Sequence, residues 1–78
     1  MSDDLHKTLK CRPLSLDFNM TNRWARLHMA EGECCDMSGC IELVQRISYG
    51  IDYIETYSGN KKDTCYRRVN GKWIVQAV

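Results

Sequence analysis

A β-hairpin is the clearest local feature of the chain: residues 65–75 read CYRRVNGKWIV, and the rest of the fold is inferred outward from them. A two-residue Asn-Gly loop adopts the positive φ angles of a type I′ turn, and the Asn-Gly pair at 70–71 lies between two runs of strand-forming residues. This turn sets the register, so that Arg68 lies opposite Trp73. Alternation along the two strands then gives one face of Tyr66, Arg68, Trp73 and Val75 and a second face of Cys65, Arg67, Val69 and Ile74.

The C-terminal half of the chain has the composition of a β-sheet. All nine Ile and Val residues lie at position 41 or later, and β-branched side chains suit a pleated, half-buried surface. Residues 51–57 are rich in strand formers, and the Gly, Asn and Lys residues of 58–62 predict a loop. We therefore expect a three-stranded antiparallel meander formed by 51–57, 64–69 and 72–77.

The N-terminal half uses Leu, Met and Ala in place of β-branched residues, so its composition does not indicate sheet. Thr21 or Asn22 is a suitable N-cap, and Gly32 is placed to end the helix. The Ala-Leu-Met-rich body between them predicts a helix over residues 22–31.

The segment 37–49 fits two patterns. Its apolar residues form one helical stripe, but several of them also alternate as they would in a strand. Asp36 and Ser38 are good N-cap residues, and Gly50 is placed for a left-handed C-cap. These flanks favour a second helix.

Together these segments predict an α+β fold in which two short helices pack on the three-stranded antiparallel meander. Residues 14–20 alternate between apolar and polar side chains, and they give a four-stranded sheet if they join it as an edge strand. If both 14–20 and 37–49 form strands, a small all-β barrel is the alternative.

The length of the chain limits both its organisation and its chemistry. Seventy-eight residues predict one small domain, 1–78, in which 1–12 are loosely ordered. Nucleotide-binding α/β units need roughly 150 residues, so we expect no enzyme and no cofactor. The 11 Lys and Arg residues nearly balance the 10 Asp and Glu residues. No strong overall field therefore attracts one class of partner.

Neither a secretory signal nor a membrane span is expected. The first thirteen residues contain no apolar stretch like the core of a signal peptide, and the longest apolar run is only 73–75. Five cysteines form an odd set, which favours reduced thiols over a disulfide framework. We therefore expect a cytoplasmic protein with no membrane partner.

Four residues are weak candidates for a zinc site: His28, Cys34, Cys35 and Cys40. Structural zinc ligands usually come in pairs two to four residues apart, and neither the adjacent cysteines nor the wider spacing to Cys40 fits that pattern. Cys40 and Cys65 are instead expected as small core residues. No metal is therefore assigned, and a zinc-stabilised domain is the least favoured interpretation.

Charge is divided unevenly along the chain. Residues 31–42 carry four acidic side chains and no basic one, whereas residues 59–78 carry five basic side chains against Asp63 alone. We expect the acidic patch to face a basic partner surface or the basic hairpin of a second copy. It is formed by Glu31, Glu33, Asp36 and Glu42.

Basic and aromatic side chains share the C-terminal hairpin, and three interpretations fit them. Arg, Tyr and Trp dominate the hot spots of protein interfaces, whereas cations beside aromatic rings also suit phosphates and bases. The third interpretation is a sheet edge that carries Lys and Arg only to remain unaggregated. The expected partner-binding residues are Tyr57, Lys61, Lys62, Tyr66, Arg67, Arg68, Lys72 and Trp73.

By elimination, the sequence predicts a small stand-alone protein that binds another protein through this hairpin, as an inhibitor or adaptor. Short proteins of this kind are often encoded by phages and other mobile elements to block a host machine, and we expect such a role here. A nucleic-acid-binding module that uses the same hairpin is the alternative, although a pI near 7.6 gives little long-range attraction for nucleic acid. Association into a homo-oligomer also suits a chain of this size.

Overall fold

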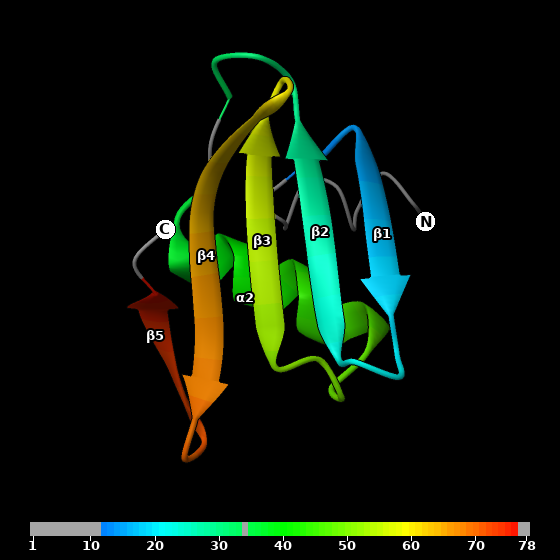
Figure 1. The fold of residues 1–78 in the computed structure, drawn as a ribbon, viewed down its shortest axis with the longest axis vertical. Coiled ribbons are helices and arrows are strands. Elements are labelled where there is room, and N and C mark those ends of the chain that lie inside the picture. Colours follow the sequence, from blue (N-terminus) through cyan, green and yellow to red (C-terminus); the bar gives the residue numbers. More distant parts are fainter. Residues whose placement is uncertain (1–11, 34, 77–78) are drawn as a thin grey trace.

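The computed structural model describes residues 12–33 and 35–76, which form a five-stranded sheet and one helix. Along the chain the elements are β1 (Ser15–Asn19), β2 (Trp24–Met29), α2 (Met37–Ile47), β3 (Tyr53–Ser58), β4 (Lys61–Val69) and β5 (Lys72–Gln76). The strands lie in the sheet in the same order as in the chain (Figure 1). β2 and β3 run parallel, and every other neighbouring pair is antiparallel.

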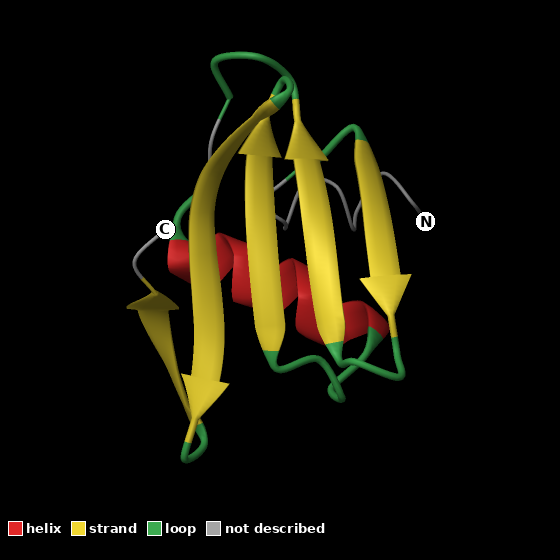
Figure 2. Ribbon diagram, viewed as in Figure 1, coloured by secondary structure: helices red, strands yellow, loops and turns green. Residues whose placement is uncertain are grey.

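Helix α2 lies across one face of the sheet, and no described helix lies over the other face (Figure 2). Parallel neighbours need a crossover connection, which α2 provides between β2 and β3 in the usual right-handed sense (Figure 1). Asp36 caps the helix, because its side chain accepts a hydrogen bond from the backbone N–H of Gly39 at 2.8 Å. At the other end, the backbone N–H of Ser48 donates to the carbonyl of Val44 at 2.9 Å.

The core lies between α2 and the face of the sheet that the helix covers. Leu27 of β2 and Ile54 of β3 are fully buried, and so are Cys40 and Val44 of the helix. Burial of a large aliphatic side chain contributes about 1.5–3 kcal/mol, so this small cluster supplies most of the stabilisation of the fold. Its other buried members are Ala25, Met29, Leu43, Ile51 and Tyr66.

The hairpin and the second helix are confirmed. Asn70 and Gly71 have φ angles of 53° and 78°, as the type I′ turn requires, and Arg68 lies opposite Trp73. α2 covers most of the segment 37–49 and has Asp36 as its N-cap, but its C-cap is Ser48, and Gly50 does not adopt the expected left-handed conformation. Residues 14–20 contain the short edge strand β1, which pairs with β2.

The expected fold class, two helices on a three-stranded antiparallel meander, is wrong. Residues 22–31 form strand β2 instead of a helix, and the sheet is five-stranded and mixed. The reason is the spacing of Ala25, Leu27 and Met29, which alternate along β2 and are all buried under α2. Pairing with β1 and β3 outweighs the helix propensity of these residues. The all-β barrel alternative is not confirmed, because 37–47 is helical.

Two further boundaries differ from expectation. The loop expected over 58–62 is a tight turn at 59–60, because Lys61 and Lys62 already belong to β4. The loose order expected for residues 1–12 falls, apart from Arg12, outside the described residues. Within 12–33 and 35–76, no helix combines the length and apolar character needed to cross a bilayer.

Candidate functional site

The face of the sheet that α2 leaves uncovered is called here the open face. Every second residue of each strand directs its side chain to this face, whereas the residues between them direct theirs to the core under α2. The register between adjacent strands places these side chains in rows across the sheet. One row joins Trp24 to Tyr53, and the next joins Arg26 to Glu55. The open face contains Asp17, Trp24, Arg26, His28, Tyr53, Glu55, Tyr57, Lys62, Cys65 and Arg67.

Glu55 is the centre of the open face. Its side chain is only 12% exposed and is surrounded by four donors from three strands. Arg26 Nε lies 2.9 Å from Oε1, and Lys62 Nζ lies 3.0 Å from Oε2. The hydroxyl of Tyr53 donates to Oε2 at 2.9 Å, and that of Tyr57 donates to Oε1 at 3.2 Å. One carboxylate therefore fixes two cations and two phenols.

The surroundings of Glu55 also set how these groups titrate. Burial raises the pKa of Glu55, but hydrogen bonds from Lys62, Tyr53 and Arg26 outweigh it, so the pKa lies below its ordinary value. The pKa of Lys62 is raised by the hydrogen bond to Glu55. Burial, together with hydrogen bonding to Cys65 and Glu55, raises the pKa of the Tyr53 phenol. At neutral pH the cluster therefore contains one carboxylate, two cations and a protonated Tyr53.

Two aromatic rings of the open face are each covered by a guanidinium group. The guanidinium carbon of Arg26 lies 4.5 Å from the centre of the Trp24 ring, and that of Arg67 lies 4.8 Å from the centre of the Tyr53 ring. Both distances are within the range of cation–π attraction. Because Arg26 also binds Glu55, the Trp24 ring and the central cluster form one connected unit.

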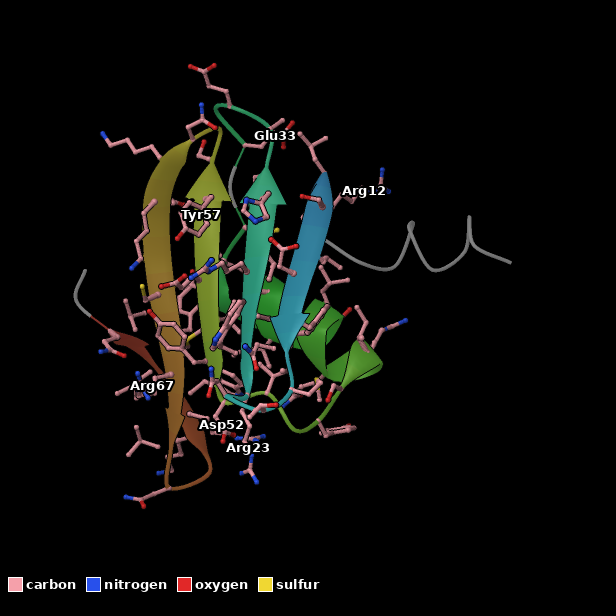
Figure 3. All side chains as sticks on the ribbon, turned by 45° about the vertical axis from the view of Figure 1, so that its right-hand side comes forward. Arg12, Arg23, Glu33, Asp52, Tyr57 and Arg67 are labelled. Carbon is pink, nitrogen blue, oxygen red and sulfur yellow. The ribbon has the colours of Figure 1, made fainter. Side chains whose placement is uncertain are left out.

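A third stacked pair lies towards the other end of the open face. The rings of His28 and Tyr57 stack with centres 5.2 Å apart and an angle of 20° between their planes. Nε2 of His28 lies 2.9 Å from Oδ2 of Asp17 on β1. In Figure 3, Tyr57 and Arg67 lie towards opposite ends of the open face. The surface between them is therefore lined by aromatic rings and cations that are fixed by stacking, cation–π contacts and ion pairs.

The structure divides the expected partner-binding residues between the two faces. Tyr57, Lys62 and Arg67 lie on the open face, whereas Tyr66 is buried in the core and Trp73 packs against it. Neighbouring positions of a strand point to opposite sides, so the hairpin does not present one continuous surface. The remaining expected residues are Arg68, which points to the covered side, and Lys61 and Lys72, which are exposed at the first positions of β4 and β5.

Arg68 serves the fold. Its Nε donates to Oδ1 of Asp52 at 3.0 Å, and a second, shorter contact joins Nη2 to the same oxygen. Nη2 also donates to the carbonyl of Tyr49 at 3.1 Å, and the guanidinium lies 5.7 Å from the centre of the Trp73 ring. Asp52 also forms an ion pair with Arg23, whose Nη1 lies 3.6 Å from Oδ2 of Asp52 (Figure 3). Arg68 thus fastens β4 to the connection that leads into β3.

The expected acidic patch is not one surface. Glu31 and Glu33 lie in the connection between β2 and α2, where Glu31 lines a shallow depression with Lys61 and Lys62. Asp36 is used as the N-cap of α2. Glu42 lies on the helix, 3.7 Å from Nη2 of Arg46. Of the four residues, only Glu31 and Glu33 therefore share one connection of the chain.

The weak zinc candidates are not brought together. His28 lies on the open face, whereas Cys40 is buried on the opposite side of the sheet and Cys35 packs against the core. Cys34 falls outside the described residues. Within the part of the chain that the structure describes, no three His, Cys, Asp or Glu side chains are grouped so that they hold a metal ion.

Five residues of the open face were missed by the sequence analysis: Asp17 of β1, Trp24 and Arg26 of β2, and Tyr53 and Glu55 of β3. The signal is the alternation in WARLHM of β2 and YIETYS of β3, where polar or aromatic residues alternate with buried ones. It was hidden in β2 because 22–31 was interpreted as a helix.

Comparison with known proteins does not add to this description. No protein-family model matches the chain, and neither a curated protein nor a solved structure matches it.

Proposed function

We propose that this protein binds another protein through the open face of its sheet. The observation that carries the proposal is the cluster around Glu55, in which one nearly buried carboxylate binds Arg26, Lys62, Tyr53 and Tyr57. Binding a partner usually costs free energy because interface side chains lose their conformational freedom. In this network the side chains are already fixed, so that cost is smaller. The open face is therefore organised for binding before a partner arrives.

The residue types of the open face support a protein partner. Trp, Tyr and Arg are the residues in which binding hot spots are most enriched. Trp24, Tyr53 and Arg67 lie close together here, with Arg67 exposed above the Tyr53 ring. We place the centre of the interface at these three residues and the polar rim at Asp17, His28 and Lys62.

The charge of the open face favours protein over nucleic acid. Three cations, Arg26, Lys62 and Arg67, share the surface with the carboxylates of Asp17 and Glu55. Two of these cations are already paired with Glu55, and a cation that a carboxylate neutralises attracts a phosphate less strongly than an unpaired one. We propose that the protein acts as an inhibitor or adaptor that occupies a partner's surface.

We also propose that it acts in the cytoplasm, since Cys40 and Cys65 are not joined in disulfides.

A matched pair of arginine substitutions tests this proposal. Tagged wild-type protein and the Arg67→Ala, Trp24→Ala and Arg46→Ala variants are used to capture partners, and mass spectrometry quantifies each captured protein. Arg46 is an exposed arginine on α2, on the opposite side of the sheet, and serves as the control. We expect Arg67→Ala and Trp24→Ala to lose a partner that Arg46→Ala retains. Equal retention by all three variants contradicts a binding site on the open face.

Nucleic-acid binding is the second candidate function, and one observation favours it. Arg26 over Trp24 and Arg67 over Tyr53 place guanidinium planes and rings on an exposed sheet, where bases stack in several single-strand binders. This candidate predicts a gel shift with single-stranded DNA or RNA that weakens steeply between low and physiological salt. No shift at low salt excludes it.

A further inference from the structure

The two edges of the sheet differ in how they are protected from pairing with another sheet. Edge strand β1 carries Asp17 at its centre, with its side chain 61% exposed, and a charge in that position opposes pairing. Strand β5 lies at the opposite edge and has no charged residue after Lys72. Ile74 and Val75 of β5 are 47% and 63% exposed. Strand β5 therefore lacks the protection that β1 has.

The backbone groups of β5 that point away from the sheet belong to Trp73 and Val75. The N–H of Arg68 donates to the carbonyl of Asp52 at 2.8 Å, so the backbone of Arg68 is directed away from β5. Arg68 lies opposite Trp73, and the two form a non-hydrogen-bonded pair of the antiparallel ladder. In such a pair, both residues direct their backbone N–H and C=O groups away from each other. The backbone groups of Trp73 therefore point outward, away from β4. Val75, two residues along, repeats the orientation. Within residues 12–33 and 35–76, no strand pairs with this side of β5.

We propose that β5 pairs antiparallel with β5 of a second copy, centred on Ile74 across a two-fold axis. In this register, Trp73 of each copy lies opposite Val75 of the other, and the two pairs exchange their outward backbone hydrogen bonds. Ile74 lies opposite Ile74, so an exposed apolar side chain on each copy becomes covered. Lys72 lies opposite Gln76, so the cationic ends of the two strands are kept apart.

A second copy fits this edge better than an unrelated peptide because the strand complements itself in this register. Its hydrogen bonds, its apolar centre and its charge all match under the same two-fold axis. The two five-stranded sheets then form one continuous sheet, and the axis places both open faces on the same side. This pairing stands independently of the function proposed above.

The oligomeric state under reducing conditions tests the pairing. Light scattering after size exclusion, over a range of micromolar concentrations, is expected to show wild-type chains shifting from monomer to dimer. Ile74→Lys places like charges opposite each other on the axis and is expected to weaken the dimer about tenfold or more. An equal mixture of the Ile74→Lys and Ile74→Glu variants is expected to restore the dimer. Ile47→Lys, at another exposed isoleucine on α2, is the control and leaves dimerisation unchanged.

A proline substitution separates edge pairing from a general loss of fold. Val75→Pro removes only an outward N–H, and edge strands tolerate proline at such positions. We expect about tenfold weaker dimerisation with an unchanged circular dichroism spectrum. A wild-type chain that stays monomeric throughout the range overturns the proposal, as does a dimer that Ile74→Lys and Val75→Pro both leave intact. Growth into polymers indicates pairing of β5 with β1 and overturns it as well.

Discussion

The two faces of this sheet are built from alternate residues of the same strands, yet different forces hold them. On the covered face, Leu27 and Ile54 are fully buried beneath α2. On the open face, Glu55 collects hydrogen bonds from cations and phenols that remain in contact with water. The comparison teaches that the covered face supplies the stability. Residues of the open face can therefore change for binding at little cost to the fold.

Neighbouring residues of β2 provide the strongest test of that division. Leu27→Ala removes a fully buried side chain and is expected to lower the free energy of unfolding by about 2–5 kcal/mol, a large part of the stability of so small a domain. His28→Ala, on the open face, loses an exposed contact with Asp17 and is expected to cost less than about 1 kcal/mol. Urea unfolding of both variants gives the comparison. Equal losses would show that a further layer covers the open face.

Adjacent arginines of β4 sharpen the comparison. Arg68 binds Asp52 and the carbonyl of Tyr49, so Arg68→Ala is expected to lower the free energy of unfolding by about 1–2 kcal/mol. Arg67 is exposed, and its Nε donates to Oε1 of Gln76 at 2.7 Å. Arg67→Ala is therefore expected to change the free energy of unfolding by less than about 0.5 kcal/mol. Thermal unfolding measures both. If Arg67→Ala is the more destabilising change, Arg67 has a structural role that its exposure does not suggest.

Local signals accounted for those parts of the fold that depend on neighbours in sequence. The Asn-Gly turn fixes the hairpin because Asn70 and Gly71 adopt positive φ without outside help. The cap at Asp36 marks the start of α2 in the same way. Strand β2 was missed because its state depends on pairing with 53–58, which lies about thirty residues away. No local propensity reports such a contact.

The open face was found only in part for the same reason. Tyr57, Lys62 and Arg67 were identified from their place in the C-terminal half, which is strand-rich in composition. Trp24 and Arg26 join them only because β2 runs parallel to β3, and a parallel pair has no turn that signals it. Glu55 was overlooked because one carboxylate among strand residues becomes distinctive only when four donors surround it.

The smallest expected effect concerns the acid dependence of the open face. Because the pKa of Glu55 is lowered in the folded chain, ionised Glu55 stabilises the fold at neutral pH, and this contribution disappears as the pH falls through the folded pKa. Glu55→Gln is expected to cost roughly 0.5–1 kcal/mol at neutral pH, since Arg26 and Lys62 become hydrated once the carboxylate is gone. Below the folded pKa, wild type and variant should converge, because both then carry an uncharged group at position 55. Urea unfolding from pH 7 downward measures the difference, with Glu42→Gln as the control on α2. A difference that stays constant with pH would mean that the charge of Glu55 does not stabilise the fold, and the open face would then be held by its ring contacts alone.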